Sequence, residues 1–154
     1  MVKNYRGIAQ EAPKTSKVPS LLVSDYMATN LITFSPDQSI QEVVQTLISR
    51  KISGGPVVND QQELVGVISE GDCLKEVVKG KYDNLPIFSG KVRDRMSSEV
   101  ISIDGDTNIF EAANMFLNRR IRRFPVLKYG KLVGQISQRD VMNAVLKLKS
   151  STWR

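Results

Sequence analysis

The chain has 154 residues, of which 41% are hydrophobic and 25% charged, and its formal net charge is +6. This size and composition suit one globular domain, or two small halves that share a core. The sequence has no histidine and one cysteine, which excludes Ser-His-Asp and Cys-His catalysis, histidine metal sites, cysteine-rich zinc sites and an internal disulfide. No apolar run approaches the roughly 20 residues of a membrane span, and no Walker or G-x-G-x-x-G phosphate loop occurs.

The first segment, residues 1–20, contains Pro13, Pro19 and mixed polar residues, and we expect an irregular N-terminal extension there. It lacks the apolar core of a secretion signal. Together with the single cysteine, this favours a cytoplasmic protein.

The next segment, residues 21–79, predicts the order β-α-β-β-α. "LITF" from Leu31 is rich in β-forming residues. Ser39 has the spacing of a helix cap, and the following helix has one apolar face at Ile40, Val43, Val44, Leu47 and Ile48. Two short strands, "PVV" and "LVGVIS", flank the polar turn "NDQQE", and a second helix begins near Asp72. Residues 80–91 are rich in turn-forming residues and predict a connector.

The second half of the chain repeats the first. An offset of 69 residues aligns 23–58 with 92–127, and an offset of 68 aligns 64–79 with 132–147. The repeated helix starts at Asn108 and has the same apolar face, including Leu117, and the last helix turns Val141, Val145 and Leu148 inward. Residues 92–148 therefore form a second unit, and 149–154 a C-terminal tail.

Each unit has only about 55 residues, which is marginal for independent folding. We therefore expect an α/β protein of the α+β type, in which two β-α-β-β-α units pack sheet to sheet with pseudo-twofold symmetry. This arrangement predicts two equivalent clefts between the units.

This plan resembles the CBS domain, named for cystathionine β-synthase, in the tandem form called a CBS pair or Bateman module. The residues that carry the resemblance are "VSDYMATNLITFSPDQSIQEVVQTLISRKISGGPVV" with "LVGVISEGD", and "VRDRMSSEVISIDGDTNIFEAANMFLNRRIRRFPVL" with "LVGQISQRD". The match covers about 21–148, so the chain looks like a stand-alone CBS-pair protein. The resemblance implies a regulatory module that binds an adenosine-containing ligand such as AMP, ADP or ATP, and not an enzyme.

The resemblance assigns the ligand site to a glycine, hydrophobic, Ser, Asp pattern that both repeats keep, at Ser69 with Asp72 and at Ser137 with Asp140. The chemistry agrees, because a carboxylate in the first turn of a helix can accept both ribose hydroxyls, while a serine hydroxyl and free helix amides suit phosphate. The same residues are also ordinary helix caps, and that alternative stays open.

The two sites differ in their cations. The family often places basic or polar residues before the proline strand, where the second repeat has Arg122 and Arg123 and the first has serine and glycine. Arg139 adds a third guanidinium, and guanidinium groups bind phosphate through paired hydrogen bonds. We therefore expect the phosphate pocket in the second repeat, with Ile32 and Ile101 as apolar walls for the base.

Alternative functions are a nucleic-acid-binding module that uses the net positive charge, a protein-interaction scaffold without ligand, and an enzyme with Asp72 or Asp140 as base. Glu70 and Asp72 could hold Mg²⁺ beside a nucleotide, but two carboxylates in one loop are common without metal. The family also implies a homodimer of CBS pairs and a regulated partner protein that the sequence does not identify.

Overall fold

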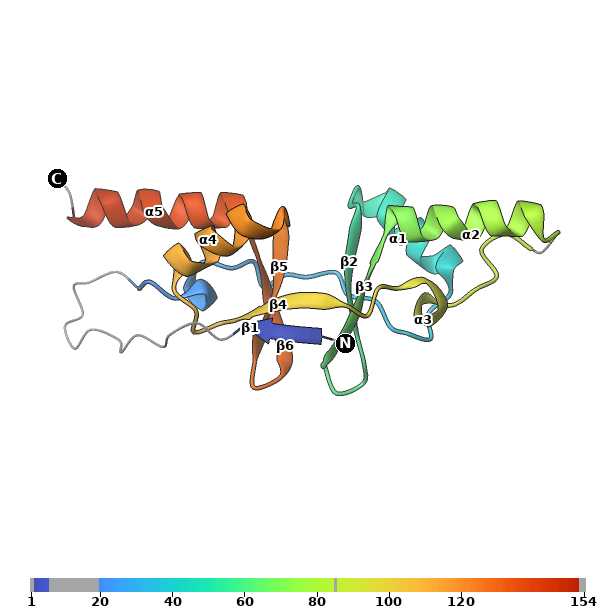
Figure 1. The fold of residues 1–154 in the computed structure, drawn as a ribbon, viewed down its shortest axis with the longest axis horizontal. Coiled ribbons are helices and arrows are strands. Elements are labelled where there is room, and N and C mark those ends of the chain that lie inside the picture. Colours follow the sequence, from blue (N-terminus) through green and yellow to red (C-terminus); the bar gives the residue numbers. More distant parts are fainter. Residues whose placement is uncertain (1, 6–19, 85, 153–154) are drawn as a thin grey trace. The chain divides into compact units, whose positions relative to one another are not determined.

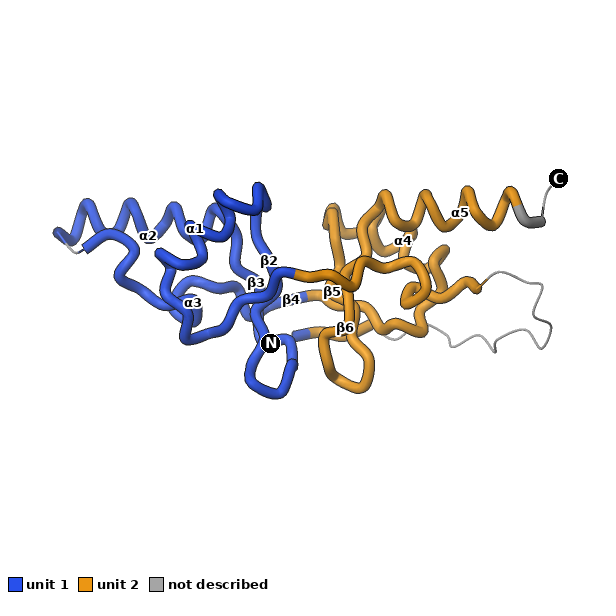
Figure 2. The backbone as a smooth tube through the Cα atoms, turned by 180° about the vertical axis from the view of Figure 1, so that it is seen from behind, with its two compact units in different colours: residues 1–2, 32–100 blue, residues 3–31, 101–154 orange. Residues whose placement is uncertain are grey.

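The structure is a computed structural model that describes residues 2–5, 20–84 and 86–152 (Figure 1). The second half of the chain follows the β-α-β-β-α order, and the first half has the same order except that its first segment forms no strand, so the α+β fold class is confirmed. The chain forms two compact units: unit 1 contains Met1–Val2 and Ile32–Val100, and unit 2 contains Lys3–Leu31 and Ile101–Arg154 (Figure 2). We describe each unit by itself.

Unit 1 is built around an antiparallel pair of strands, β2 and β3, in which Gly54 lies opposite Ser69. Helix α2 begins at the residue after β3, so the strand end and the helix start form one corner. The elements of this unit are α1 (Ile40–Arg50), β2 (Gly54–Val58), β3 (Leu64–Ser69), α2 (Glu70–Tyr82) and α3 (Val92–Arg95).

Unit 2 has the larger sheet, with strand order β1-β4-β5-β6. Strands β4 and β5 are parallel, and β5 and β6 form an antiparallel hairpin in which Arg123 lies opposite Ser137. The elements are β1 (Val2–Tyr5), the 3-10 helix η1 (Val23–Asp25), β4 (Val100–Asp104), α4 (Ile109–Arg119), β5 (Arg123–Lys128), β6 (Lys131–Ser137) and α5 (Gln138–Thr152).

The boundaries of the compact units differ from the boundaries of the sequence repeats. The first segment of each repeat packs in the compact unit that contains the rest of the other repeat. The amide of Val23 donates to the carbonyl of Thr107 in unit 2, and the amide of Val92 donates to Gln38 in unit 1. These two bonds join equivalent positions in the two repeats. Each unit is therefore completed by a segment from the other half of the sequence.

Two buried glycines make this exchange possible. A Cβ atom on Gly66 would lie 2.7 Å from the carbonyl oxygen of Ser97, and one on Gly134 would lie 2.8 Å from that of Ala28. The exchanged segments thus pass directly over β3 and β6, where only glycine leaves room. The close backbone approach that these two glycines permit is therefore made by the chain itself.

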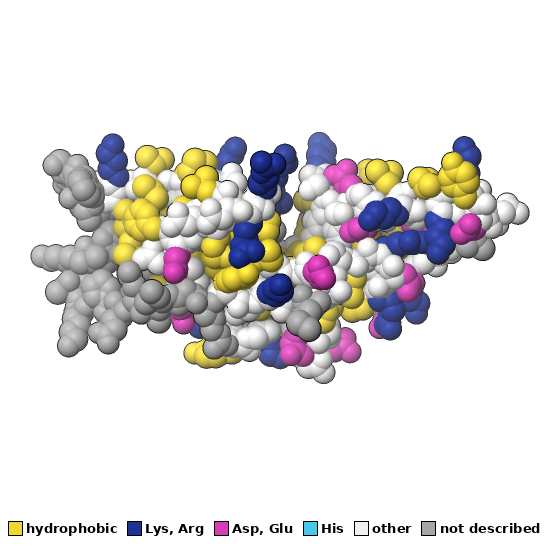
Figure 3. Space-filling view, in the orientation of Figure 1, with side chains coloured by type: hydrophobic (Ala, Val, Ile, Leu, Met, Phe, Trp, Pro, Cys, Tyr) yellow, Lys and Arg dark blue, Asp and Glu magenta, His cyan; other side chains and the backbone are white. Residues whose placement is uncertain are grey.

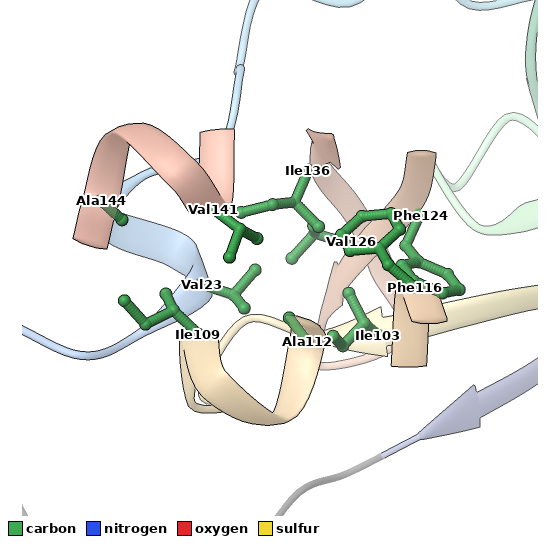
Figure 4. Packing of buried hydrophobic residues seen from close by; sticks show 10 residues of the cluster. All are labelled: Val23, Ile103, Ile109, Ala112, Phe116, Phe124, Val126, Ile136, Val141 and Ala144. Atoms are coloured by element: carbon green, nitrogen blue, oxygen red, sulfur yellow. The ribbon is translucent and has the colours of Figure 1, made fainter. Parts of the chain in front are cut away.

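Each unit has its own hydrophobic core. In unit 2 the core joins η1, β4, α4, β5, β6 and α5, and Phe116 packs against Phe124 with ring centroids 4.6 Å apart (Figure 4). In unit 1 a smaller core joins α1, β2, β3, α2 and α3 around Phe34 and Ile68. The exchanged residues Val23 and Val92 are fully buried in these cores, so they contribute directly to stability.

Three local predictions were wrong. "LITF" forms no strand, because it pairs only through Phe34 with Val57, whereas the equivalent β4 is supported by β1 on its other side. Ile48 and Leu117 are 73% and 81% exposed, although the helical pattern predicted both as buried. Val145 is 37% exposed, because the inward face of α5 is carried by Val141 and Ala144 instead.

The chain ends also differ from the expected extension and tail. Within the expected irregular extension 1–20, Val2–Tyr5 forms β1, which the Ser102 hydroxyl anchors by donating to the carbonyl of Lys3. Helix α5 continues into the expected tail as far as Thr152. The rest of the extension, residues 6–19, and the last two residues lie outside the described part of the chain.

Candidate functional site

The first candidate site is the corner where β3 enters α2. The Ser69 amide and hydroxyl both donate to Oδ2 of Asp72, at 2.9 Å each, and the Asp72 amide donates to the Ser69 hydroxyl oxygen at 3.3 Å. This is a capping box, in which each residue satisfies a backbone group of the other. The helix-cap alternative is thus correct for this geometry. The cap also holds the Asp72 carboxylate in one orientation, and its Oδ1 atom makes none of the hydrogen bonds of the capping box.

The second candidate site, where β6 enters α5, repeats this geometry. The Ser137 amide donates to Oδ2 of Asp140 at 2.9 Å, and the Asp140 amide donates to the Ser137 hydroxyl oxygen at 3.1 Å. Both side chains are half-buried. Because Oδ1 takes no part in these bonds, a capped carboxylate can still accept hydrogen bonds from a ligand.

The arginines lie around the second corner. Arg123 begins β5 and is the register partner of Ser137, so its backbone is next to the capped serine. Arg139 precedes Asp140 in the first turn of α5, and Arg122 precedes β5. All three arginines are exposed. The predicted phosphate-binding residues and the predicted ribose-binding carboxylate are therefore brought to the same end of the β5–β6 hairpin.

The two apolar residues predicted to contact a base belong to other segments of the chain than β5, β6 and α5. Ile32 packs against the core of unit 1 and Ile101, in β4, packs against the core of unit 2. Both are half-buried, so part of each side chain is covered by ordinary core packing. Contact with a base stays a prediction for both.

Charge separates the two units. Unit 1 contains eight Lys and Arg residues and ten Asp and Glu residues, whereas unit 2 contains fourteen and six. The positive charge of the chain therefore resides in unit 2, where the arginine-bearing corner lies. A local excess of positive charge raises the local concentration of anionic ligands.

The cysteine near the first corner is not activated as a nucleophile, and the carboxylates there do not join a cluster of three or more possible metal ligands within the described residues. Burial, followed by the nearby charges of Asp72, Glu70 and Glu76, raises the pKa of the Cys73 thiol above its ordinary value. A thiol with a raised pKa is a poor nucleophile at neutral pH. No group of three or more possible ligand side chains that could hold a metal ion occurs within the described ranges.

The first turns of α2 and α5 also differ at a position that the sequence-based prediction did not include. Arg139 aligns with Gly71, and the preceding residue changes from Glu70 in α2 to Gln138 in α5. The signal was present in the repeat alignment, in "SEGD" against "SQRD". It bears on ligand charge, because both positions lie beside the capped carboxylate.

Comparison with known proteins identifies the family. Residues 23–79 and 92–147 each match the CBS domain, which together is most of the chain. The chain therefore belongs to the CBS-domain family and contains two CBS domains in tandem. Every helix in the described ranges falls short of the length and hydrophobicity needed to span a membrane.

Two curated relatives match most of this chain. CBSX2, a chloroplastic CBS domain-containing protein of Arabidopsis thaliana, is 28% identical over 84% of this chain and 66% of its own length. MJ1426 of Methanocaldococcus jannaschii, an uncharacterized protein, is 28% identical over 82% of this chain and 92% of its own. MJ1225 of the same organism is also 28% identical, but the chain spans only 44% of it.

Solved structures agree with the fold. The structure of CBSX2 in complex with AMP matches with a TM-score of 0.71 at 29% identity, and covers 84% of this chain and 99% of the other. The structure of MJ1225 matches with a TM-score of 0.70 at 21% identity, and covers 84% of this chain and 49% of the other. The AMP in the CBSX2 structure belongs to that protein, and it supports a nucleotide-binding role for the family to which this chain belongs.

Proposed function

We propose that this chain is a regulatory module that binds an adenosine nucleotide at the corner formed by β5, β6 and α5. The observation that carries the proposal is the pairing of Arg123 with Ser137 beside the capped Asp140. The AMP complex of CBSX2, at 29% identity, supports an adenylate as the ligand. The proposed role is ligand-dependent regulation rather than catalysis.

Each group in this corner has a chemical task. Oδ1 of Asp140 accepts the ribose hydroxyls, because the cap engages Oδ2 and fixes the carboxylate plane. Arg123 and Arg139 bind the 5′ phosphate through charge-assisted hydrogen bonds, and Arg122 adds positive charge. The N-terminus of the 15-residue helix α5 adds its partial positive charge. AMP satisfies all of these groups, and ADP or ATP would extend further toward the arginines.

A thermal-shift panel of AMP, ADP and ATP tests the proposal. A ligand at about 100 times its dissociation constant stabilises the folded chain by about 2.7 kcal/mol. For a chain of this size we expect the Tm to rise by roughly 5 to 11 °C. GMP serves as the matched control, because it carries the same phosphate and ribose on a different base. The absence of a Tm shift with every adenylate at millimolar concentration would contradict the proposal.

Regulation requires that ligand binding be coupled to a second state. A ligand shifts a conformational equilibrium only by its differential affinity for the two states. We propose that adenylate binding changes the affinity of the module for a partner protein. Tight nucleic-acid binding that falls steeply with salt, without preference among mononucleotides, would favour the nucleic-acid alternative instead.

A homodimer is part of the proposal, because both repeats expose apolar side chains at the same helical positions. Leu74 and Val78 on α2 correspond to Met142 and Leu146 on α5, and all four are more than half exposed. Hydrophobic side chains are visible along the outer edge of each of these two helices (Figure 3). Such a repeated surface suits an isologous contact with a second copy of the chain.

The dimer prediction is tested by sedimentation velocity. We expect the wild-type chain to sediment as a dimer at micromolar concentration and the double variant Val78→Glu/Leu146→Glu to sediment as a monomer. Charges in an apolar interface lose their solvation without gaining a partner. Tyr129→Glu is the control, because Tyr129 is 88% exposed in the β5–β6 turn, at the opposite end of the hairpin from the start of α5. A monomeric wild type would contradict the dimer.

A further inference from the structure

Unit 1 contains a cavity of about 330 Å³ between α2, α3 and the end of the connector. Sites for small organic ligands have volumes of roughly 300 to 1,000 Å³, so this cavity is large enough for a small one. Its lining belongs entirely to unit 1 and includes neither residue of the Ser69–Asp72 cap. The polar and charged side chains of the lining are those of Glu76, Lys79, Ser89, Asp94 and Arg95.

A buried ion pair forms one wall of this cavity. Glu76 is 8% exposed; its Oε1 accepts a hydrogen bond from the Gly90 amide at 2.9 Å, and its Oε2 accepts one from Nε of Arg95. Both carboxylate oxygens are thus engaged by the protein, and they fix the position of the guanidinium. The two terminal nitrogens of Arg95 make no hydrogen bond within the described residues. Their N–H groups are therefore available to a ligand.

The repeated fold does not require this ion pair, because unit 2 is built without it. The residues equivalent to Glu76 and Arg95 are Ala144, which is fully buried, and Tyr26, which packs against the core. Apolar side chains in place of a buried ion pair are often neutral or stabilising. Stability alone therefore does not explain why unit 1 has two opposite charges at these positions.

Unit 2 also has side chains where unit 1 has the cavity. The Tyr26 hydroxyl donates to the carbonyl oxygen of Ser20, and Ser20 is the equivalent of Ser89 in the cavity lining. Leu148, which packs against the core of unit 2, is the equivalent of Gly80, which also lines the cavity. The cavity of unit 1 thus arises from particular differences between the repeats.

The connector has an unusual backbone conformation beside the cavity. Phe88 has a φ angle of 63°, in a region that bulky residues rarely adopt. Its side chain packs against the core of unit 1, and the next two residues, Ser89 and Gly90, line the cavity. Backbone conformations of this kind cluster at ligand sites, where the surrounding structure maintains them. The contact of Phe88 with the core therefore holds this wall of the cavity in place.

We propose that this cavity binds a small molecule through an oxyanion group, which is a phosphate or a carboxylate. The terminal N–H groups of Arg95 donate charge-assisted hydrogen bonds to the oxyanion. Lys79 lines the cavity, makes no ion pair within the described residues, and supplies a second cation. Glu76 is a positioning residue, because it acts on the ligand only through Arg95. This site is separate from the proposed nucleotide site in unit 2.

Titration of the ¹⁵N-labelled chain with inorganic phosphate, and separately with succinate, tests the proposal. Ionic strength is held constant with sodium chloride, and no nucleotide is present. We expect saturable amide shifts at Gly80, Ser89, Gly90 and Arg95 with at least one of the two anions at millimolar concentration. The anion that binds more tightly identifies the oxyanion as a phosphate or a carboxylate.

Four variants separate ligand binding from a structural role. Glu76→Ala/Arg95→Tyr gives unit 1 the residues of unit 2 and should abolish the saturable shifts at Gly80, Ser89 and Gly90 in a chain that remains folded. Lys79→Ala should weaken anion binding by about three- to fivefold, as expected for an exposed cation. Lys81→Ala is its matched control, since Lys81 is an exposed lysine on the same helix outside the cavity lining, and its affinity should stay within twofold of wild type.

The fourth variant should change the affinity in the opposite direction. Asp94 lines the cavity, and its Oδ2 accepts a hydrogen bond from the Lys91 amide at 3.2 Å, at the start of α3. Asn keeps an oxygen for this bond but removes a negative charge that repels an anion. Asp94→Asn should therefore tighten anion binding by about two- to fivefold.

Three results would overturn the proposal. The first is the absence of saturable shifts at the cavity amides with both anions, and the second is undiminished binding in a folded Glu76→Ala/Arg95→Tyr variant. The third is equal weakening by Lys79→Ala and Lys81→Ala, which would mean that anions respond to the general charge of α2. None of these results bears on AMP binding in unit 2, which the separate AMP titrations measure.

Discussion

Replacement of Glu76 by alanine should destabilise unit 1 by about 3 kcal/mol, because it leaves a partly buried guanidinium without its partner. Glu76, on α2, is 8% exposed and accepts hydrogen bonds from the Arg95 side chain and, at 2.9 Å, from the Gly90 amide. The ion pair thereby ties α2 to α3 and to the end of the connector. For a chain of this size the loss corresponds to a fall in Tm of roughly 6 to 12 °C, measurable by calorimetry.

The residues at the equivalent positions of unit 2 suggest a second variant for this experiment. The positions equivalent to Glu76 and Arg95 are Ala144, which is fully buried, and Tyr26, which packs against the core. The double variant Glu76→Ala/Arg95→Tyr should therefore recover at least half of the lost stability, since replacing both members of a buried ion pair is often nearly neutral. Glu99→Gln, at an exposed position, is the control for loss of one carboxylate. A Tm of Glu76→Ala equal to that of wild type would show that the pair contributes nothing.

Replacement of Arg123 by alanine should weaken AMP binding about 10- to 100-fold, because a charge-assisted hydrogen bond to phosphate contributes about 1.5 to 3 kcal/mol. The affinity for adenosine should change less than twofold, since adenosine has no phosphate. Calorimetric titration of both ligands gives the two ratios. A selective loss for AMP assigns Arg123 to the phosphate rather than to the fold of the hairpin.

Lys128 provides the matched control for Arg123. It is an exposed basic residue at the opposite end of the same strand, so Lys128→Ala changes the net charge equally without touching the Ser137 corner. We expect its AMP affinity to stay within twofold of wild type. Equal losses in both variants would mean that AMP responds to the overall charge of unit 2, and Arg123 would have no specific role.

The repeat and its helices could be predicted from the sequence because both are local patterns. The apolar spacing that starts at Ile40 and at Ile109 predicted α1 and α4. The exchange of first segments could not be predicted, since Val23 and Val92 occupy equivalent positions in identical patterns, and either could complete either core. The predicted burial of Ile48 and Leu117 was wrong, because a helical pattern identifies apolar positions but does not show which of them the core covers and which stay exposed to solvent.

The candidate site was predictable in chemistry and only partly in geometry. The Ser–Asp spacing and the arginines near Asp140 were visible in the sequence, and the structure brings them to one corner. Two features depend on three-dimensional contacts between backbones. One is the lack of room for a side chain at Gly54, where a Cβ atom would lie 2.5 Å from the carbonyl oxygen of Ile68. The other is the hydrogen bond that the Glu70 amide donates to the carbonyl oxygen of Ser53. Neither has a sequence pattern of its own.

The most direct test of adenylate binding by unit 2 is a titration of the ¹⁵N-labelled chain with AMP, followed by amide chemical shifts. We predict saturable shifts at Arg122–Phe124 and Ser137–Asp140, with the amides of Ser69–Asp72 unchanged. Unchanged amides throughout unit 2 at millimolar AMP, or saturable shifts confined to unit 1, would contradict this assignment.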